Sequence, residues 1–292
     1  MITENMPPPL TLLADLIGTL RADAEAAYQA RKSGQPRGPV TGLSGLDEAL
    51  GGFLQPGLHI LQAAPGAGKT AFALQIASSC QFPALLVTAE MPTLELFRRL
   101  IARQTQTFLG KLKSGELDPG EVERLAIKTA GKLPGLAIMD AMRTHAEPGH
   151  IRDAAEGLRE RLGGDQCLVV VDSLHVWAKG GPVGDSVSEY DLLNAALKSL
   201  VSIAAEVRCP LMVVAHRNRA GQEKGGLHAA KGTGSIEYLA ETVIDLTPAE
   251  MGFDAAGERT VTAGIHKNRN GHAGMGVALK FSGRLQSFRE GQ

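Results

Sequence analysis

The sequence predicts an α/β fold with a mostly parallel central sheet. Three observations support this prediction. Short aliphatic runs alternate with helical patterns from Gly57 onward, which is typical of a parallel sheet covered on both faces. A glycine-rich loop follows the first predicted strand at Ala63 and precedes a predicted helix. Residues 259–288 lack long helical patterns, so we expect C-terminal antiparallel strands there.

Residues 10–31 are predicted to form an N-terminal amphipathic helix, because apolar side chains recur at spacings of three and four. These side chains are Leu10, Leu13, Ile17, Leu20 and Ala24. Residues 32–41 are rich in glycine, proline and charge, as linkers are. We therefore expect a helix and linker at 1–40 and the main domain at 41–292. The helix needs a partner, and both its own domain and another copy of the chain remain open.

The aliphatic runs that predict strands are short and bounded by helical or polar residues. They lie at 57–63, 83–89, 135–140, 167–172, 210–216 and 242–246. Two stretches, 178–188 and 217–234, are too polar and glycine-rich to be core elements. Loops this long inside a compact domain are usually functional or disordered.

The overall charge excludes binding through bulk electrostatics. The chain has 30 Lys and Arg against 31 Asp and Glu, a net charge of −1. A polyanion such as nucleic acid must therefore meet a local basic patch. The three cysteines lie far apart in apolar surroundings, which favours reduced thiols and a cytoplasmic protein. The apolar runs are far shorter than the roughly 20 residues of a bilayer span, so we expect no membrane partner.

The strongest motif is a P-loop that departs from the G-x-x-x-x-G-K-[ST] pattern only at Ala63. Glycines let backbone N–H groups turn toward phosphate oxygens, and the following helix adds its positive N-terminal end. The residues predicted to bind the nucleotide are Ala64, Pro65, Gly66, Ala67, Gly68, Lys69, Thr70 and Ala71. Lys69 is expected to contact the β and γ phosphates of ATP, and Thr70 to hold Mg²⁺.

Three further polar residues end predicted strands, where ligands bind in parallel sheets. Asp172 ends the strand CLVVVD, as a Walker B acid does, and is expected to help hold Mg²⁺. Glu90 follows LLVTA, and it is either a general base or a solvated acid before the next helix. His216 follows PLMVVA, where a structural histidine and a sensor of the γ-phosphate are both open.

The order of these segments, from Thr41 to Phe288, resembles the RecA-like ATPase domain of DnaB-type hexameric helicases of superfamily 4. The matching segments include AAPGAGKTAFALQIA, LLVTAEM, LVVVDSL, PLMVVAHRNR and HKNRNGHAGMGVALKF. The resemblance implies that Glu90 is the catalytic base and that His216 replaces a glutamine that senses the γ-phosphate. It also implies that Lys267 and Arg269 reach the neighbouring subunit's ATP, with Arg269 as an arginine finger.

The resemblance further implies a homo-oligomer, a hexameric ring, tied together by the N-terminal helix. Because only about 40 residues precede the match, we expect the helical N-terminal domain of full-length replicative helicases, and its primase contacts, to be absent. Loops at 178–190 and 217–234 would line a channel for single-stranded DNA. The second loop carries the basic residues predicted to contact DNA, namely Arg217, Arg219, Lys224 and Lys231.

The predicted function is therefore an ATP-dependent helicase or translocase on single-stranded DNA. The alternative is an ATPase of the RecA, RadA or KaiC kind that controls assembly or loading without unwinding. A metabolite kinase is disfavoured, because the single basic stretch at 217–231 is better explained as a channel loop than as a substrate lid.

Overall fold

The computed structural model describes residues 10–181, 187–217, 238–249 and 252–291. By its internal contacts the chain divides into two units, Met1–Arg37 and Gly38–Gln292, and each is described by itself. The first unit contains a 3-10 helix, η1 (Leu13–Leu16), followed by helix α1 (Ile17–Ser33). The helix ends at Gly34, whose φ of 70° is left-handed and suits glycine.

Helix α1 has no buried residue. The apolar side chains of Leu13, Ile17 and Leu20 are 84%, 66% and 68% exposed. The described part of this unit holds no further helix or strand that covers them. An ion pair between Arg37 and Asp23 ties the end of the unit back to the helix. The helix thus begins later than the predicted residue 10, and the apolar side chains that it does carry are exposed.

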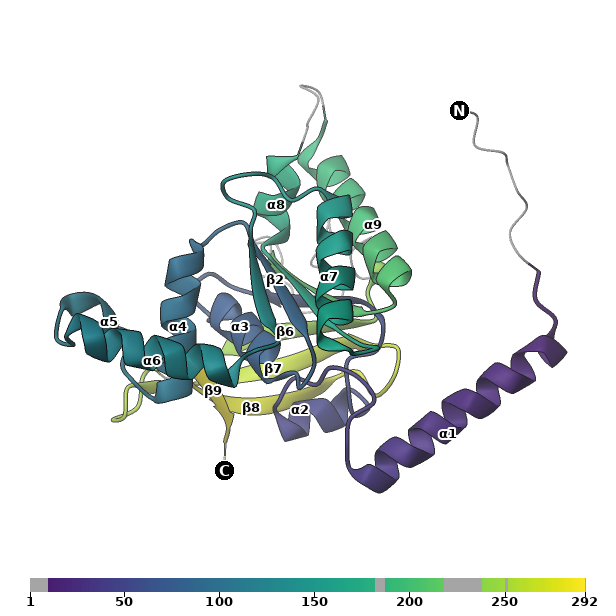
Figure 1. The fold of residues 1–292 in the computed structure, drawn as a ribbon, viewed down its shortest axis with the longest axis horizontal. Coiled ribbons are helices and arrows are strands. Elements are labelled where there is room, and N and C mark those ends of the chain that lie inside the picture. The colour runs from purple at the N-terminus through teal and green to yellow at the C-terminus, as the bar shows by residue number, and fades with distance from the viewer. Residues whose placement is uncertain (1–9, 182–186, 218–237, 250–251, 292) are drawn as a thin grey trace. The chain divides into compact units, whose positions relative to one another are not determined.

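The second unit is built on one sheet of nine strands within the described residues, in the order β3-β2-β4-β5-β1-β6-β7-β8-β9 (Figure 1). The first six strands in that order are parallel, and β7 to β9 are antiparallel. The parallel strands are β1 (Gly57–Ala63), β2 (Ala84–Thr88), β3 (Leu136–Asp140), β4 (Leu168–Asp172), β5 (Pro210–His216) and β6 (Thr242–Pro248). The antiparallel strands are β7 (Glu258–Asn268), β8 (Met275–Ser282) and β9 (Ser287–Glu290). This confirms the predicted fold class.

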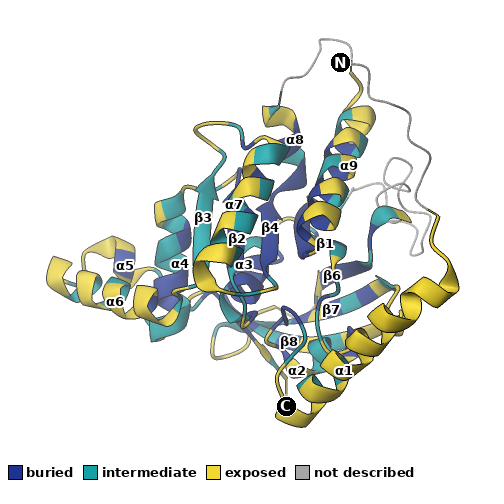
Figure 2. Ribbon diagram, turned by 45° about the vertical axis from the view of Figure 1, so that its right-hand side comes forward, coloured by how far each residue is buried: buried dark blue, intermediate teal, exposed yellow. Residues whose placement is uncertain are grey.

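Helices cover both faces of the parallel part. One face carries α3 (Lys69–Ser79) and α4 (Thr93–Thr105). The other carries α7 (Pro148–Leu162), α8 (Leu174–Gly180) and α9 (Glu189–Val207). Because successive side chains of a strand alternate, Val170 joins the first core and its neighbour Val171 joins the second. Figure 2 shows β4 as buried, the edge strand β3 as intermediate and much of the outer helix surface as exposed.

The remaining helices are α2 (Ser44–Ala49), α5 (Lys111–Ser114) and α6 (Pro119–Lys132). Helix α6 begins where Asp118 accepts a hydrogen bond from the backbone N–H of Glu121 at 3.0 Å, with Pro119 as the first helical residue. Both features stabilise a helix N-terminus. A small apolar cluster that includes Ile101 and Leu112 connects α4 to this region.

The predicted loop at 178–188 begins too early, because α8 extends to Gly180. Trp177 anchors this helix: its indole Nε1 donates to the carbonyl oxygen of Ala146 at 2.8 Å, and its ring stacks on His145 at 5.6 Å. Local composition could not reveal this anchor, because Trp177 and Ala146 are 31 residues apart in the sequence. Within the described residues, no helix is long and apolar enough to cross a membrane.

Candidate nucleotide-binding site

The strand register brings four chain segments to one edge of the sheet. Ala63 lies opposite His216, and Thr88 lies opposite Asp172. The carboxyl ends of β1, β2, β4 and β5 therefore meet, and the loops that follow them share one surface. The backbone N–H of Ala89 donates to the carbonyl oxygen of Asp172 at 2.7 Å, which fixes the start of the segment that carries Glu90.

The P-loop folds as a turn that leads directly into α3. Gly66 and Gly68 have φ values of 77° and 95°, a region that residues with a Cβ atom rarely adopt. At Gly68 a Cβ would also lie 3.0 Å from the ring of Phe288. Gly68 is the N-cap of α3, so the N-terminal end of that helix faces the loop. This geometry suits a phosphate group.

Lys69 is buried within the loop. Its Nζ donates to the carbonyl oxygens of Ala63 and Ala64 at 3.0 and 3.2 Å. Burial lowers the pKa of Lys69, while the negative charges of Glu90 and Asp172 oppose that shift. A phosphate oxygen placed in the loop would compete with these two carbonyls for the ammonium group. The loop therefore holds its lysine ready at the position that a phosphate would occupy.

Asp172 ends β4 and is only 3% exposed. Burial raises its pKa to about 6, and a hydrogen bond with the side chain of Thr70 opposes the shift. Among the described residues, its buried Oδ1 atom has no hydrogen-bond partner. A buried carboxylate oxygen without a partner is costly unless a cation or water satisfies it. The two oxygen donors, Asp172 and Thr70, therefore fit a magnesium ion.

Glu90 lies between the ends of β4 and β5. Its Oε1 accepts a hydrogen bond from the hydroxyl of Ser173 and lies 3.2 Å from Nε2 of His216. The ring of His216 meets that of His175 edge-on at 5.4 Å. Within the described residues both hydrogen bonds of Glu90 involve Oε1, so Oε2 is the atom that can face a water molecule.

Two contacts at this edge were missed by the sequence analysis. Ser173, the partner of Glu90, follows the Walker B strand but belongs to no motif that we used. Arg259, near the start of β7, donates to the carbonyl oxygen of Gly66 and lies over the ring of Phe281 at 5.3 Å. The arginine and the glycine are 193 residues apart, so no local pattern could reveal their contact.

Of the residues predicted to contact DNA, only Arg217 is described. Its guanidinium forms an ion pair with Asp245, which is 1% exposed, and donates to the hydroxyl of Thr247 at 3.1 Å. Its charge is thus engaged inside the domain, and burial lowers its pKa. Arg219, Lys224 and Lys231 lie outside the described residues.

Lys267 and Arg269 lie at the opposite, amino edge of the sheet. The Nζ of Lys267 donates to the carbonyl oxygen of Tyr238 at 3.3 Å, and Nη2 of Arg269 donates to the same oxygen at 2.6 Å. Strand β1 carries the chain roughly 20 Å from this edge to the P-loop, at about 3.3 Å per residue. Neither side chain is therefore placed to serve the nucleotide site of its own chain.

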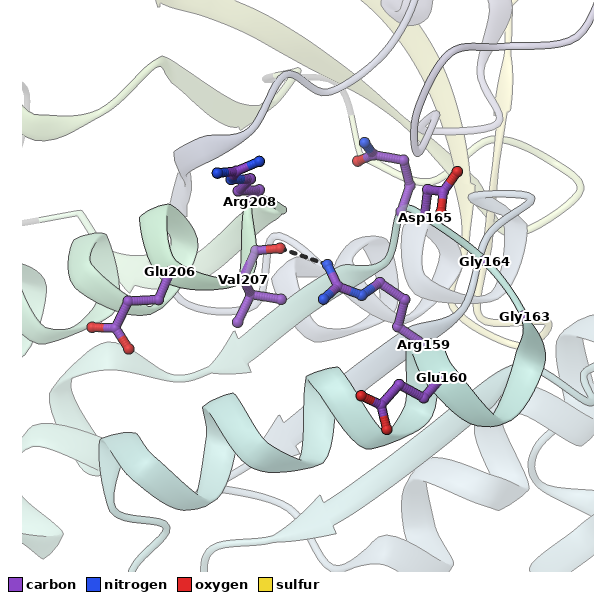
Figure 3. A pocket seen from close by; sticks show the side chains of 9 residues that line it. Arg159, Glu160, Gly163, Gly164, Asp165, Glu206, Val207 and Arg208 are labelled. Atoms are coloured by element: carbon purple, nitrogen blue, oxygen red, sulfur yellow. Dashed lines mark hydrogen bonds between the residues drawn. The ribbon is translucent and has the colours of Figure 1, made fainter.

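A cavity of about 770 Å³ also opens at the amino edge, between the C-terminal ends of α7 and α9 (Figure 3). Arg159 crosses it and donates to the carbonyl oxygen of Val207 at 2.8 Å. The cavity lies at the opposite edge of the sheet from Lys69 and Asp172. It is therefore separate from the nucleotide-binding residues.

Known proteins that resemble the chain include curated replicative DNA helicases named DnaB. The Haemophilus influenzae protein is 27% identical over 263 residues, which cover 86% of this chain and 55% of the relative. The Leifsonia xyli protein is 27% identical over 277 residues, covering 91% of this chain and 59% of the relative. The chain thus spans between half and two thirds of the length of these relatives.

The fold is also similar to solved structures. An ATPase domain of known structure superposes with a TM-score of 0.80 at 20% identity, covering 97% of this chain and 100% of that one. A DnaB-like replicative helicase, described with its interactions with primase, gives 0.77 at 20% identity and covers 97% and 68%. A KaiC-like protein from Pyrococcus horikoshii gives 0.57 at 17% identity and covers 87% and 98%.

These likenesses agree with the RecA-like fold of the sheet. The model of the DnaB-like helicase C-terminal domain matches residues 38–290, almost the whole of the second unit. The chain therefore belongs to the DnaB-like helicase C-terminal domain family.

Proposed function

We propose that this chain is the ATP-hydrolysing motor of a DnaB-type helicase that translocates on single-stranded DNA as a hexameric ring. One observation carries the proposal. The groups that bind and hydrolyse ATP lie at the carboxyl edge of the sheet, whereas Lys267 and Arg269 lie at the amino edge of the same sheet. A complete site then needs two copies of the chain, as a ring provides.

At the carboxyl edge each residue has a role that its contacts support. The N–H groups of the P-loop and Lys69 bind the phosphates, after Lys69 exchanges its carbonyl partners for phosphate oxygens. Glu90 accepts a proton from the attacking water through Oε2, while Ser173 and His216 hold Oε1 in place. His216 thereby links Glu90 to the segment after β5.

Thr70 and Asp172 would hold a magnesium ion beside the phosphates. When bound, the ion would neutralise the charge that develops on the β and γ phosphate oxygens. The buried Oδ1 of Asp172 supports this assignment, because within the described residues it lacks any other partner. Burial also raises the pKa of Asp172, which is costly for a carboxylate at neutral pH.

At the amino edge Arg269 would act on the ATP of the neighbouring copy. Arginine fingers supplied in this way are worth roughly 10³ to 10⁵ in rate for P-loop NTPases. Lys267, on the same strand end, would add a second positive charge. Hydrolysis should therefore depend on assembly.

The N-terminal helix and the channel loops complete the proposed ring. We assign residues 1–40 as a helix and linker that pack on a neighbouring copy, and 41–292 as the motor. The exposed stripe of α1 supports a partner outside its own unit's described residues. The basic loop at 217–234 would contact DNA phosphates, with six copies acting together. Binding should weaken with salt, by about 0.7 log unit per phosphate neutralised for each tenfold rise in salt concentration.

The test is strand displacement on a forked duplex with ATP and Mg²⁺, together with native mass in the presence and absence of ATP. We expect unwinding and a hexamer, and a K69A variant should abolish unwinding. ATP hydrolysis and assembly without displacement would instead support the alternative, an ATPase that controls assembly or loading.

A further inference from the structure

Glu241 is the residue that holds Arg269 in place. Oε1 of Glu241 accepts a hydrogen bond from Nη1 of Arg269 at 2.7 Å. Its other oxygen, Oε2, is 3.5 Å from the side-chain nitrogen of Asn270. The carboxylate thus contacts two consecutive residues of the segment that follows β7. The side chain of Glu241 is 22% exposed, against 49% for Arg269.

The backbone of Glu241 is fixed on both sides. Its N–H donates to the carbonyl oxygen of Leu58 at 2.7 Å, and its own carbonyl accepts from the N–H of Arg269 at 2.9 Å. Gly57 makes room for its side chain, since a Cβ at that glycine would lie 2.6 Å from Cγ of Glu241. The carboxylate is therefore attached to the rigid sheet, whereas the arginine side chain projects from the end of a strand.

A second acceptor also holds the Arg269 guanidinium. The carbonyl oxygen of Tyr238 accepts from Nη2 of Arg269 at 2.6 Å, while Glu241 accepts from Nη1. A guanidinium group is a planar fork with five N–H donors, so acceptors at both Nη atoms fix its plane and leave other N–H groups available. A long arginine side chain otherwise samples many rotamers, and catalysis depends on orientation.

We propose that Glu241 is a positioning residue for the arginine finger: its carboxylate orients the Arg269 guanidinium toward the γ-phosphate bound by the neighbouring copy. This inference rests on the proposed function of Arg269. Glu241 acts through Arg269 and touches no nucleotide. Its own chain's P-loop lies at the other edge of the sheet, so the effect of Glu241 crosses the subunit boundary.

The experiment compares E241A, E241Q and E241D in the full chain, with E206Q as the matched control. Glu206 is an exposed carboxylate on α9 that pairs with Arg152 and not with Arg269. We expect E241A to lower kcat for ATP by about 10-fold to 100-fold, the range that a misplaced group costs, with the KM for ATP changed by less than about 2-fold. E241D should retain more activity than E241A, and E206Q should match the wild type.

Mixed rings separate positioning from general damage. Subunits with K69A cannot use their own ATP but still present Arg269, so they should restore hydrolysis to R269A subunits. K69A/E241A subunits should restore at least about 10-fold less, although their own nucleotide site is already inactive. E241A should cost nothing further on an R269A background, because both changes remove the same interaction.

The mixed rings test the shared nucleotide site and the role of Glu241 separately. If K69A subunits do not rescue R269A subunits, the proposed shared site is wrong. If they do, but K69A/E241A subunits rescue equally well, only the role of Glu241 is wrong. A drop in thermal stability, measured by calorimetry, that accounts for all of the activity lost in E241A would also overturn the positioning role.

Discussion

The two edges of the sheet differ in how they hold their charged groups. At the carboxyl edge Lys69 and Asp172 are buried, and their pKa values move in opposite directions for the same reason. At the amino edge Arg269 is half exposed and is held by Glu241 and a backbone carbonyl. The first edge is arranged to enclose a ligand, whereas the second presents a group to the outside. Under the proposed function, one chain therefore carries two halves of different sites.

Mixing subunits that are defective at different edges is expected to give the largest effect. Arg259, at the carboxyl edge, is the contrast to Arg269, at the amino edge. R269A should reduce ATP hydrolysis by about 10³-fold or more, because a finger is lost. Adding K69A subunits should restore it. R259A should also reduce hydrolysis, since Arg259 contacts Gly66 of its own P-loop, but K69A subunits should not restore it. Equal rescue of both variants in a steady-state ATPase assay would remove the distinction between the edges.

The next largest effect is expected at Glu90. E90Q keeps the shape of the side chain but removes the proton acceptor, so hydrolysis should fall by about 10² to 10⁴-fold while nucleotide binding is retained. Hydrolysis is measured by phosphate release and binding by a fluorescent nucleotide. E123Q, on the exposed surface of α6, is the control and should be unchanged. Loss of nucleotide binding in E90Q would place Glu90 among the binding residues instead.

The burial of Asp172 at the carboxyl edge can be tested through the pH dependence of stability. Because its pKa is raised to about 6, the folded protein binds this proton more tightly than the unfolded chain, and stability is lost as pH rises from about 4 through 6. D172N removes that penalty. Without nucleotide and with EDTA, it should stabilise the protein by up to about 3 kcal/mol at pH 7.5 and by much less near pH 4. Urea unfolding at the two pH values measures this, and an equal effect at both would contradict the prediction.

Arg217 gives the smallest of the expected effects. R217Q leaves the buried carboxylate of Asp245 without its main partner, which usually costs roughly 3 to 5 kcal/mol. Because Arg217 is partly exposed and Thr247 still donates to Asp245, we expect a loss of about 2 kcal/mol. The double variant R217Q/D245N should recover part of it. If stability is unchanged and the salt dependence of single-stranded DNA binding falls instead, Arg217 is primarily a DNA contact.

Much of the fold followed from the sequence because the parallel strands are buried on both faces. The aliphatic runs ending at Ala63, Asp172 and His216 had no other plausible structure, and their register brings the motif residues together. The predicted start of a loop at 178 was wrong, since the contact of Trp177 with Ala146 joins distant parts of the chain.

The contacts that position the motif residues could not be predicted. Arg259 meets the P-loop because the start of β7 lies at the edge of the sheet where β6 ends. Glu241 meets Arg269 because the start of β6 and the end of β7 are neighbours. Both residues have ordinary local surroundings in the sequence. Motifs thus predicted the groups that would touch the ligand, and the structure shows the contacts that hold them.

The helical content of α1 is expected to depend on the concentration of the protein. Within its own unit this helix of 17 residues has no buried side chain, and isolated helices of this length are marginal in water. Its helical content should therefore rise as copies associate. In a dilution series, far-ultraviolet circular dichroism would then report on subunit association, with the unwinding of this segment marking the dissociated protein.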